Sequence, residues 1–449
     1  MAVDVIILAA GKGTRMLSDI PKPLHSLLGK PMIDYVVEAA APVADHPPVL
    51  VVGHGSQEIQ QVLGDKLRYV EQTDLLGTGH AVWQAESLIK GKSDLVLVVY
   101  GDMPLVRTET LKKLVEAQQA HNGPLSILTL VAEDPRGFGR IFRDEKGGIR
   151  AIVEEADATT EQLAIKELNA GMYCFQAEWL WKSLSEIPLS PKGEYYLTDL
   201  IGIAVKGGQT VASVQIGDPQ ELLGINTRVH LAEASQILRG RVNRSLMEAG
   251  VSLIDPASTY IEPGVKIGQD TVIQPNTYLE GKTVIGNNCL IGPGTRIVDS
   301  QVGNGCEIEF SVIEESRLED GVDIGPFSHL RKGAHLAAGV HVGNFGEIKD
   351  SYLGEGTKMG HFSYLGNAQV GKNVNIGAGT ITCNYDGKEK HQTVIKDNVF
   401  IGSDSMLVAP LEIGENSTTG AGSVVTKDVP PDSVVVGVPA RVIRRKDRE

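Results

Sequence analysis

The sequence predicts an α/β doubly wound domain followed by a left-handed parallel β-helix of hexapeptide repeats, with the two joined by a helix. Three observations predict this organisation. Apolar strands alternate with helical stretches in the first half, aliphatic residues recur at nearly every sixth position in the second half, and an amphipathic stretch separates them. The predicted domains cover residues 1–227 and 250–449, and the helix covers residues 228–249.

The first domain contains continuous apolar runs, namely VIILAA at 5–10, PVLVVG at 48–53 and DLVLVVYGD at 94–102. Such runs are typical of parallel strands that are buried on both faces. Helical patterns are expected between them, at 31–40 and 109–120. In a fold of this class the ligand binds at the carboxyl ends of the strands, so we expect the site there.

Residues 228–249 are expected to form one helix, because apolar side chains recur along one of its faces. These residues are Leu231, Ala234, Leu238, Val242 and Leu246, and Gly250 provides the stop.

The second domain repeats with period six, which no α-helix has. Three hexads close one triangular coil, so residues eighteen apart stack roughly 4.8 Å from one another, in on the order of nine coils. The cadence fails at 382–393, where an excursion loop is expected. Two runs keep strict register: Ile261, Ile267, Ile273, Leu279, Ile285, Ile291 and Ile297, and then Leu318, Ile324, Leu330, Leu336, Val342 and Ile348.

Composition excludes several classes of protein. The net charge of −14 argues against a nucleic-acid partner. The sequence has no apolar run long enough for membrane insertion. The start of the chain lacks the cationic segment of a signal peptide, and the four cysteines have no metal-type spacing, so we expect a reduced, cytoplasmic protein.

A glycine-rich loop, LAAGKGTRM at 8–16, follows the first strand and precedes PKPL at 21–24. Two glycines let backbone N–H groups approach a phosphate, and Lys12, Arg15 and Lys22 add positive charge. The loop has neither a Walker A motif nor a GxGxxG fingerprint, which makes a P-loop ATPase or a Rossmann dehydrogenase a poor fit.

This loop and its surroundings resemble the sugar-nucleotide pyrophosphorylases, nucleotidyltransferases with a Rossmann-like domain. The resemblance implies that a sugar 1-phosphate oxygen attacks the α-phosphorus of a nucleoside triphosphate and expels pyrophosphate, while the protein aligns groups and neutralises charge. Further matching segments follow in order: EQTDLLGTGHA (71–81), YGDMPL (100–105), GFGRI (137–141), IVEE (152–155), ELNAGMY (167–173) and GINTR (224–228).

Asp102 follows a buried strand and is placed to hold Mg²⁺, and the resemblance adds Asn226 as the second metal ligand. The resemblance also implies that Arg15 and Lys22 contact the phosphates as catalytic residues. It implies UTP as the nucleotide, with Gln72, Gly77 and Thr78 reading uracil. The other residues expected to bind substrate here are Leu8, Ala9, Ala10, Gly11, Gly139, Glu154 and Asn169.

The β-helix carries its own candidate site. Arg331 and Lys349 are eighteen apart in unbroken register, so they stack in adjacent coils, and two such cations predict a phosphate between them. His329, His335 and His341 suggest a zinc trio, but the hexad spacing places them on three successive faces, where they diverge.

His361 lies in KMGHFSYLG (358–366), near Tyr364 and before the excursion loop. Acetylation of an amine by a thioester requires removal of a proton as the nitrogen attacks. An imidazole suits that task, so we expect His361 to be a general base.

This segment and NIGAGTITCNYDG (375–387) resemble the hexapeptide-repeat acyltransferases. With the first domain, the chain resembles bifunctional bacterial enzymes that acetylate glucosamine 1-phosphate with acetyl-CoA and then uridylylate the N-acetylglucosamine 1-phosphate. The resemblance implies a homotrimer with acetyl-transfer sites between chains. It places Arg331, Lys349, Tyr364 and Asn375 on the sugar phosphate and Ala378, Asn384, Tyr385, Ser403 and Ala421 on acetyl-CoA.

One position departs from that pattern. Where relatives carry an arginine for coenzyme A near the C-terminus, this chain has Val438, and Arg441 is expected to substitute for it. Two alternatives remain: a monofunctional sugar-1-phosphate nucleotidyltransferase with a structural β-helix, and a non-enzymatic scaffold. The first would not need His361, and the second would not need the phosphate-binding loop.

Overall fold

The computed structural model describes residues 1–155 and 158–445. The chain divides into two compact units, Met1–Leu238 and Arg239–Glu449. The division falls inside helix α9 (Arg228–Glu248), which occupies the stretch expected to be helical. Residues 446–449, the end of the predicted second domain, lie outside the described residues. Among the described residues, no helix has both the length and the hydropathy of a membrane span.

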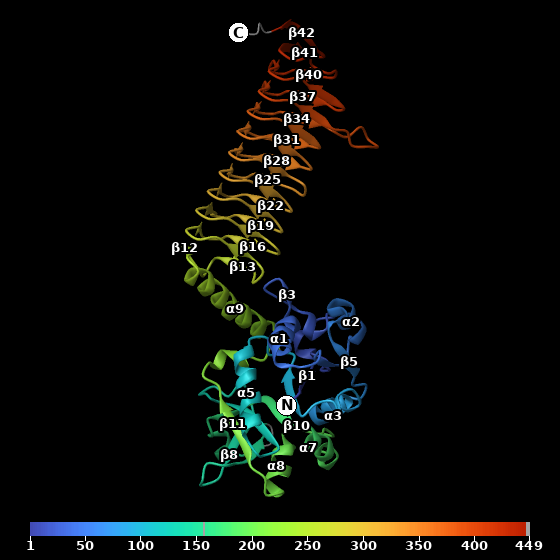
Figure 1. Ribbon diagram of the computed structural model, residues 1–449, viewed down its shortest axis with the longest axis vertical. Helices are drawn as coiled ribbons and strands as arrows, with labels where there is room; N and C mark the ends of the chain where they lie inside the picture. Colours follow the sequence, from blue (N-terminus) through green and yellow to red (C-terminus); the bar gives the residue numbers. More distant parts are fainter. Residues whose placement is uncertain (156–157, 446–449) are drawn as a thin grey trace. The chain divides into compact units, whose positions relative to one another are not determined.

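The first unit is built on a mixed sheet with helices on both of its faces (Figure 1). β1 pairs in parallel with β4 and β6, as the three apolar runs predict. β10 is antiparallel to both β6 and β7, and it also carries the hairpin β8–β9, so the sheet is not wholly parallel. The main strands in spatial order are β11 (Val211–Gln215), β7 (Leu125–Val131), β10 (Glu167–Gln176), β6 (Leu95–Tyr100), β1 (Val3–Leu8), β4 (Val49–Val52) and β5 (Arg68–Glu71), with β8 (Arg140–Arg143) and β9 (Ile149–Val153) attached.

The side chains of the central strands point alternately into two separate apolar cores, one on each face of the sheet. In β1, Val5 and Ile7 belong to one core, whereas Ile6 and Leu8 belong to the other. Burial on both faces explains why the strands are continuous apolar runs. The helices α1 (Met32–Ala40), α2 (Ser56–Leu63), α3 (Thr78–Gln84), α4 (Glu86–Ile89), α5 (Thr108–Ala120), α7 (Ala177–Ser183) and α8 (Asp199–Lys206) each contribute buried residues, whereas the short α6 (Thr160–Leu163) contributes none.

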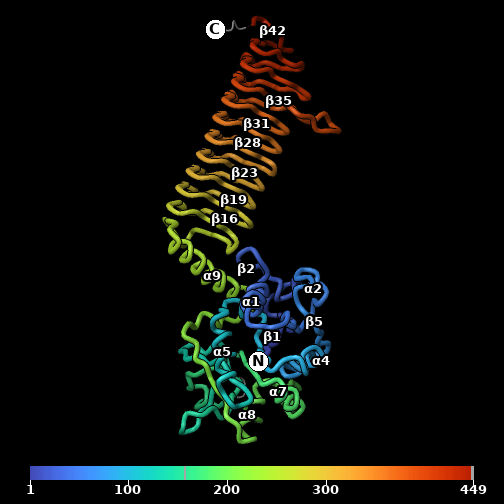
Figure 2. Tube along the Cα trace, viewed as in Figure 1, coloured from blue at the N-terminus to red at the C-terminus, as the bar shows by residue number. Residues whose placement is uncertain are grey.

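The second unit is a left-handed parallel β-helix, whose coils are stacked in Figures 1 and 2. Short strands from β12 (Ser252–Leu253) to β40 (Val424–Val425) form three parallel sheets, and the aliphatic residues of the cadence fill the interior. The sheet that begins at β14 (Lys266–Ile267) has nine strands, which agrees with the expected number of coils.

The eighteen-residue rule holds only in part of the stack. Val272 pairs with Leu290 and His329 with Glu347, both eighteen apart. Elsewhere in the stack the spacing is shorter: Arg296 pairs with Val312, sixteen residues apart, and Glu347 pairs with Tyr364, seventeen residues apart. The irregular steps in the cadence therefore shorten corners and leave the strand pairing intact.

The excursion leaves the stack between β34 (Ile381–Cys383) and β35 (Thr393–Ile395), as the break in the cadence predicts, and it projects clearly in Figures 1 and 2. Tyr385 and Lys390 form an antiparallel bridge within it. The stack ends in the antiparallel hairpin β41 (Ser433–Gly437) and β42 (Ala440–Arg445).

Candidate active sites

The first unit contains a cavity of about 630 Å³ where the carboxyl ends of β1 and β6 meet β10. It brings together nearly every residue that the sequence placed at this site. Arg15 is the exception: it is exposed, in the 3₁₀ turn Thr14–Met16, and does not line the cavity. The expected residues that do line it are Leu8, Ala9, Ala10, Gly11, Lys22, Gln72, Gly77, Thr78, Asp102, Gly139, Glu154, Asn169 and Asn226.

At one end of the cavity, three side chains converge on a single point. Lys22 Nζ lies 2.5 Å from Asp102 Oδ2 and 2.9 Å from Asn226 Oδ1. A backbone hydrogen bond of 2.8 Å from Ile225 N to Asp102 O holds the two oxygen-bearing segments together. Gly13, at φ 62°, packs against the lysine stem, since a Cβ there would lie 2.6 Å from Lys22 Cβ. The ammonium group therefore occupies the place where both oxygens point.

This arrangement fits Mg²⁺. A carboxylate and an amide oxygen are hard ligands, and Mg²⁺ bound with phosphates uses only one or two protein ligands. The two oxygens already converge on one cation, the ammonium group of Lys22. The described residues contain no group of three His, Cys, Asp or Glu side chains able to hold a metal.

The opposite wall of the cavity comes from α3 and the strand that precedes it. Gln72 Nε2 donates to Gly77 O at 3.1 Å, and Thr78 Oγ1 accepts a hydrogen bond from Leu197 N at 3.0 Å. Gly77 has φ 94°, and a Cβ there would lie 2.7 Å from Tyr195 O. Glycine is therefore required for this close approach of two backbone segments.

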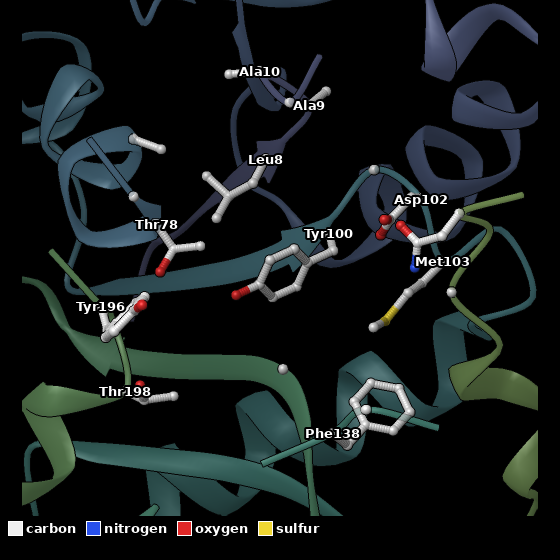
Figure 3. A pocket seen from close by; sticks show the side chains of 18 of the residues that line it. Leu8, Ala9, Ala10, Thr78, Tyr100, Asp102, Met103, Phe138, Tyr196 and Thr198 are labelled. Carbon is white, nitrogen blue, oxygen red and sulfur yellow. The ribbon is translucent and has the colours of Figure 1, made fainter. Parts of the chain in front are cut away.

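A further part of the cavity lining combines polar groups of β6 and β10 with Glu154, directly after β9, and Thr198, directly before α8. Thr198 Oγ1 donates to Glu154 Oε1 at 3.0 Å, and Asn169 Nδ2 donates to Tyr173 Oη at 2.8 Å. Burial, and next the nearby charge of Glu154, raise the pKa of Tyr100 above its usual range, so its phenol stays protonated. Figure 3 shows the Tyr100 ring in the middle of the cavity.

Several lining residues were not foreseen from the sequence. In Figure 3, Tyr196 and Thr198 lie on the same side of the cavity as Thr78, whereas Met103 lies beside Asp102. Tyr100, Met103 and Phe138 belong to motifs already quoted, so their position could have been found. Tyr196 and Thr198 lie outside all of those motifs.

In the β-helix, four predicted residues form one corner column. Lys358 pairs with Asn375, Asn375 with Phe400, and Phe400 with Thr418. The residues three positions after these four paired residues therefore stack on one another in successive coils. The aligned residues are His361, Ala378, Ser403 and Ala421.

The C-terminal hairpin continues this column. Thr419 pairs with Val435, which aligns Gly437 with Ala421, and Arg441 pairs with Val436 in the hairpin. Val438 is exposed immediately after the aligned glycine. Arg441 is thus close in register to the upper end of the column, where the sequence predicted that it substitutes for an arginine.

A basic cluster lies at the next corner of the coil. The strands before Arg331 and Lys349 pair in register, as predicted. Arg331 Nη1 binds Glu347 Oε1 at 2.8 Å, and the contact of Lys349 with Lys390, then its repulsion by Lys390 and Arg331, lower the pKa of Lys349. Lys390 was not predicted; it comes from the excursion loop, from which the sequence resemblance named only Asn384 and Tyr385.

The remaining predicted acetyl-site residues are divided between sheets. Tyr364 lies on β31 (Ser363–Gly366) and pairs with Glu347 of the preceding coil. A Cβ on Gly366 would contact both Tyr364 Oη and Asn384 Nδ2. Asn375 lies on β33 (Asn375–Ile376), in a different sheet. Tyr385 is exposed on the excursion loop.

The histidine trio diverges as predicted. The three residues lie on β25 (His329–Leu330), β26 (His335–Leu336) and β27 (His341–Val342), each in a different sheet. His329 Nε2 lies 3.2 Å from Glu314, His335 Nε2 lies 2.9 Å from Glu319, and His341 Nδ1 lies 2.5 Å from Asp323. Each histidine has its own acidic partner from the preceding coil.

Comparison with known proteins covers both units. Residues 5–169 match the MobA-like NTP transferase domain, and residues 264–299 and 392–427 match the bacterial transferase hexapeptide (six repeats). Over 438 residues, 97% of this chain and 95% of the relative, it is 47% identical to the bifunctional protein GlmU of Streptococcus agalactiae serotype V. The identity is 48% to that of Heliobacterium modesticaldum, over 96% and 94% of the two chains, and 47% to that of Syntrophomonas wolfei, over 97% of each.

The chain belongs to the GlmU family. Membership extends over both units, because each alignment spans nearly the whole chain. An NTP transferase domain and transferase hexapeptide repeats therefore occur together in one bifunctional enzyme of this family, as the two sequence resemblances predicted.

Proposed function

We propose that this enzyme makes UDP-N-acetylglucosamine in two steps. The β-helix transfers an acetyl group from acetyl-CoA to the amine of glucosamine 1-phosphate. The first unit then transfers UMP from UTP to N-acetylglucosamine 1-phosphate and releases pyrophosphate. The observation that carries the second step is the convergence of Lys22, Asp102 and Asn226 in one cavity with Gln72, Glu154 and Asn169.

In the uridyltransferase site, the chain aligns two anions and balances their charge. Gln72, Gly77 and Thr78 hold the uracil, while Gly139, Glu154 and Asn169 hold the sugar, so that the sugar phosphate oxygen faces the α-phosphorus. Lys22 neutralises phosphate charge. Asp102 and Asn226 would hold Mg²⁺, which when bound neutralises the triphosphate.

Arg15 is also proposed to contact the phosphates, as the family motif implies. Its exposed position in the 3₁₀ turn is outside the cavity, so the contact requires the 11–20 loop to move toward the nucleotide. Leu8 ends β1, Ala9, Ala10 and Gly11 follow it, and all four line the cavity.

In the acetyltransferase site, His361 removes a proton from the amine as the nitrogen attacks the thioester carbonyl. The bond to sulfur then breaks and coenzyme A leaves as a thiol, which accounts for the proton and the leaving group. Acetyl-CoA lies along the column of His361, Ala378, Ser403 and Ala421, with Arg441 beyond it. Arg331, Lys349 and Lys390 bind the sugar phosphate.

We further propose a homotrimer. Phe310, Phe327 and Phe345 form an exposed ladder with ring centroids 5.6 and 5.5 Å apart, and each has a positive φ (44°, 63° and 58°). Apolar rings held outward in a strained backbone region fit a surface that a second chain covers. A cytoplasmic location fits the four free cysteines, because thiols stay reduced there.

Two variants test the division of labour. His361→Ala should abolish thiol release from acetyl-CoA and leave pyrophosphate release from UTP unchanged. Asp102→Ala should do the reverse. If the wild type released no thiol with glucosamine 1-phosphate, the β-helix would be structural and the enzyme monofunctional.

Assembly is tested separately. Phe327→Ser, measured by light scattering, should lower the mass of the particle from three chains toward one, with loss of acetyl transfer and retention of uridyl transfer. A wild-type particle with the mass of a single chain would contradict the trimer.

A further inference from the structure

Two side chains of α3 form a hydrogen-bonded chain with Gln72. Gln72 Nε2 lies 3.1 Å from Gly77 O and 3.0 Å from His80 Nδ1. On the other side of the imidazole, His80 Nε2 lies 3.1 Å from the side-chain amide of Gln84. Gln72 lines the cavity and is only 4% exposed, whereas His80 and Gln84 are not among the lining residues.

The orientation of the Gln72 amide follows from its partners. A peptide carbonyl can only accept, so the atom that faces Gly77 O must be the amide nitrogen. Its two hydrogens then point at Gly77 O and His80 Nδ1, which leaves the amide oxygen to face the cavity. The reverse orientation would bury two oxygens against each other without a donor, which is costly at a site with so little access to water.

The same geometry sets the proton on the histidine. Nδ1 accepts from Gln72 only if the ring is neutral and carries its proton on Nε2. Gln84 Nε2 lies 3.1 Å from both His80 Nε2 and the backbone His80 O, so Gln72 and Gln84 both turn an amide nitrogen toward the ring. A neutral imidazole has a single acceptor nitrogen, so one of the two amides must turn over. Gln84 is the more exposed of the two: it can turn its oxygen to the Nε2 proton, give up the hydrogen bond to His80 O and direct its amide hydrogens to water.

We propose that His80 is a positioning residue that makes the nucleotide site selective for uracil over cytosine. This rests on the proposed reading of the base by Gln72. Uracil offers an N3–H to the fixed Gln72 oxygen, whereas the unprotonated N3 of cytosine would turn a lone pair toward it. If the Gln72 amide could turn over, its nitrogen would face the cavity and donate to N3 of cytosine. His80 therefore gives selectivity by keeping the Gln72 oxygen toward the base.

The test compares kcat/KM for UTP and CTP, with N-acetylglucosamine 1-phosphate as acceptor. The ratio of the two values does not depend on how much of a preparation is active. His80→Leu removes the acceptor and should lower the UTP-to-CTP ratio by about tenfold or more. His80→Asn supplies an oxygen near the position of Nδ1 and should restore the ratio to within about threefold of wild type.

Gln84→Leu is a second, independent variant, and its position is partly exposed, so the substitution should be tolerated by the fold. Without Gln84 the ring proton can move to Nδ1, so the ratio should fall, but by less than in His80→Leu. An unchanged ratio in an active His80→Leu enzyme would overturn the proposal. If that variant does not fold, an unchanged ratio in Gln84→Leu overturns it instead.

The outcomes separate this role from the function on which it rests. A wild type that releases pyrophosphate from neither nucleotide would remove the proposed uridyl transfer, and with it any selectivity. A wild type that strongly prefers UTP, with His80 variants that keep the preference, would leave uridyl transfer intact and show that other contacts select the base.

Discussion

Replacement of Lys22 by methionine should make the proposed metal site at Asp102 and Asn226 bind a divalent cation more tightly in the absence of nucleotide. In the structure, the ammonium group of Lys22 lies 2.5 Å from Asp102 and 2.9 Å from Asn226, so a metal ion must displace it to reach both oxygens. Methionine keeps most of the length of the side chain but offers no charge and no hydrogen bond.

The size of the effect follows from the contact that is lost. The Lys22 and Asp102 side chains are 13% and 25% exposed, so solvent screens their ion pair only partly. A hydrogen bond between charged groups contributes about 1.5–3 kcal/mol, which corresponds to an affinity gain of about 10- to 150-fold once the competitor is removed.

The assay is the binding of Mn²⁺ to the nucleotide-free enzyme, followed by electron paramagnetic resonance of the free ion. Lys12→Met is the matched control, because it removes the same charge from an exposed position in the neighbouring glycine-rich loop, and no more than about a twofold gain is expected from that screened charge. The reasoning is refuted if the two variants bind Mn²⁺ equally well, or if Lys22→Met binds it no better than wild type.

Three further results are expected. Thr198→Val removes the 3.0 Å hydrogen bond to Glu154 and should raise KM for N-acetylglucosamine 1-phosphate by about tenfold in steady-state assays, and an unchanged KM would show that Glu154 does not need this support. Lys390→Gln removes the neighbour that lowers the pKa of Lys349. If Lys349 binds the sugar phosphate as a cation, as proposed, the alkaline limb of the acetyl-transfer profile of kcat/KM should move to higher pH, and KM for glucosamine 1-phosphate should rise at neutral pH. If the alkaline limb did not move, deprotonation of Lys349 would not be the cause of the loss of activity at high pH. Ile348→Ala empties a fully buried position in the β-helix and should destabilise the second unit by about 2–5 kcal/mol in calorimetry, with uridyl transfer retained, and a loss below about 1 kcal/mol would contradict tight packing there.

The repeat made the second unit easy to predict, because period six is incompatible with a helix and each hexad must form a strand and a corner. The spacing of Arg331 and Lys349 was sufficient to predict that they stack. The break in the cadence located the excursion loop. Which of its side chains folds back was not encoded in the spacing, so Lys390 emerged only from the structure.

In the first unit, the continuous apolar runs predicted β1, β4 and β6 and also their parallel pairing. They did not predict β10, which is antiparallel to its neighbours β6 and β7, because polar residues and a glycine interrupt its sequence ELNAGMYCFQ. The expected motif residues line the cavity, with the exception of Arg15. Tyr196 and Thr198 reach it from a loop, and no local pattern in that segment reports a contact made across the fold.

The stacked coils of the β-helix fix the distances between residues along its corner column. Each coil advances along the axis by one strand spacing, about 4.8 Å, so the distance from His361 to the hairpin at Arg441 is fixed by the number of coils between them. If acetyl-CoA lies along this column, as proposed, insertion of one complete coil there would lengthen its binding track by one such step and leave the corner geometry at His361 unchanged. The distance between the two ends of that track could then change only by whole coils.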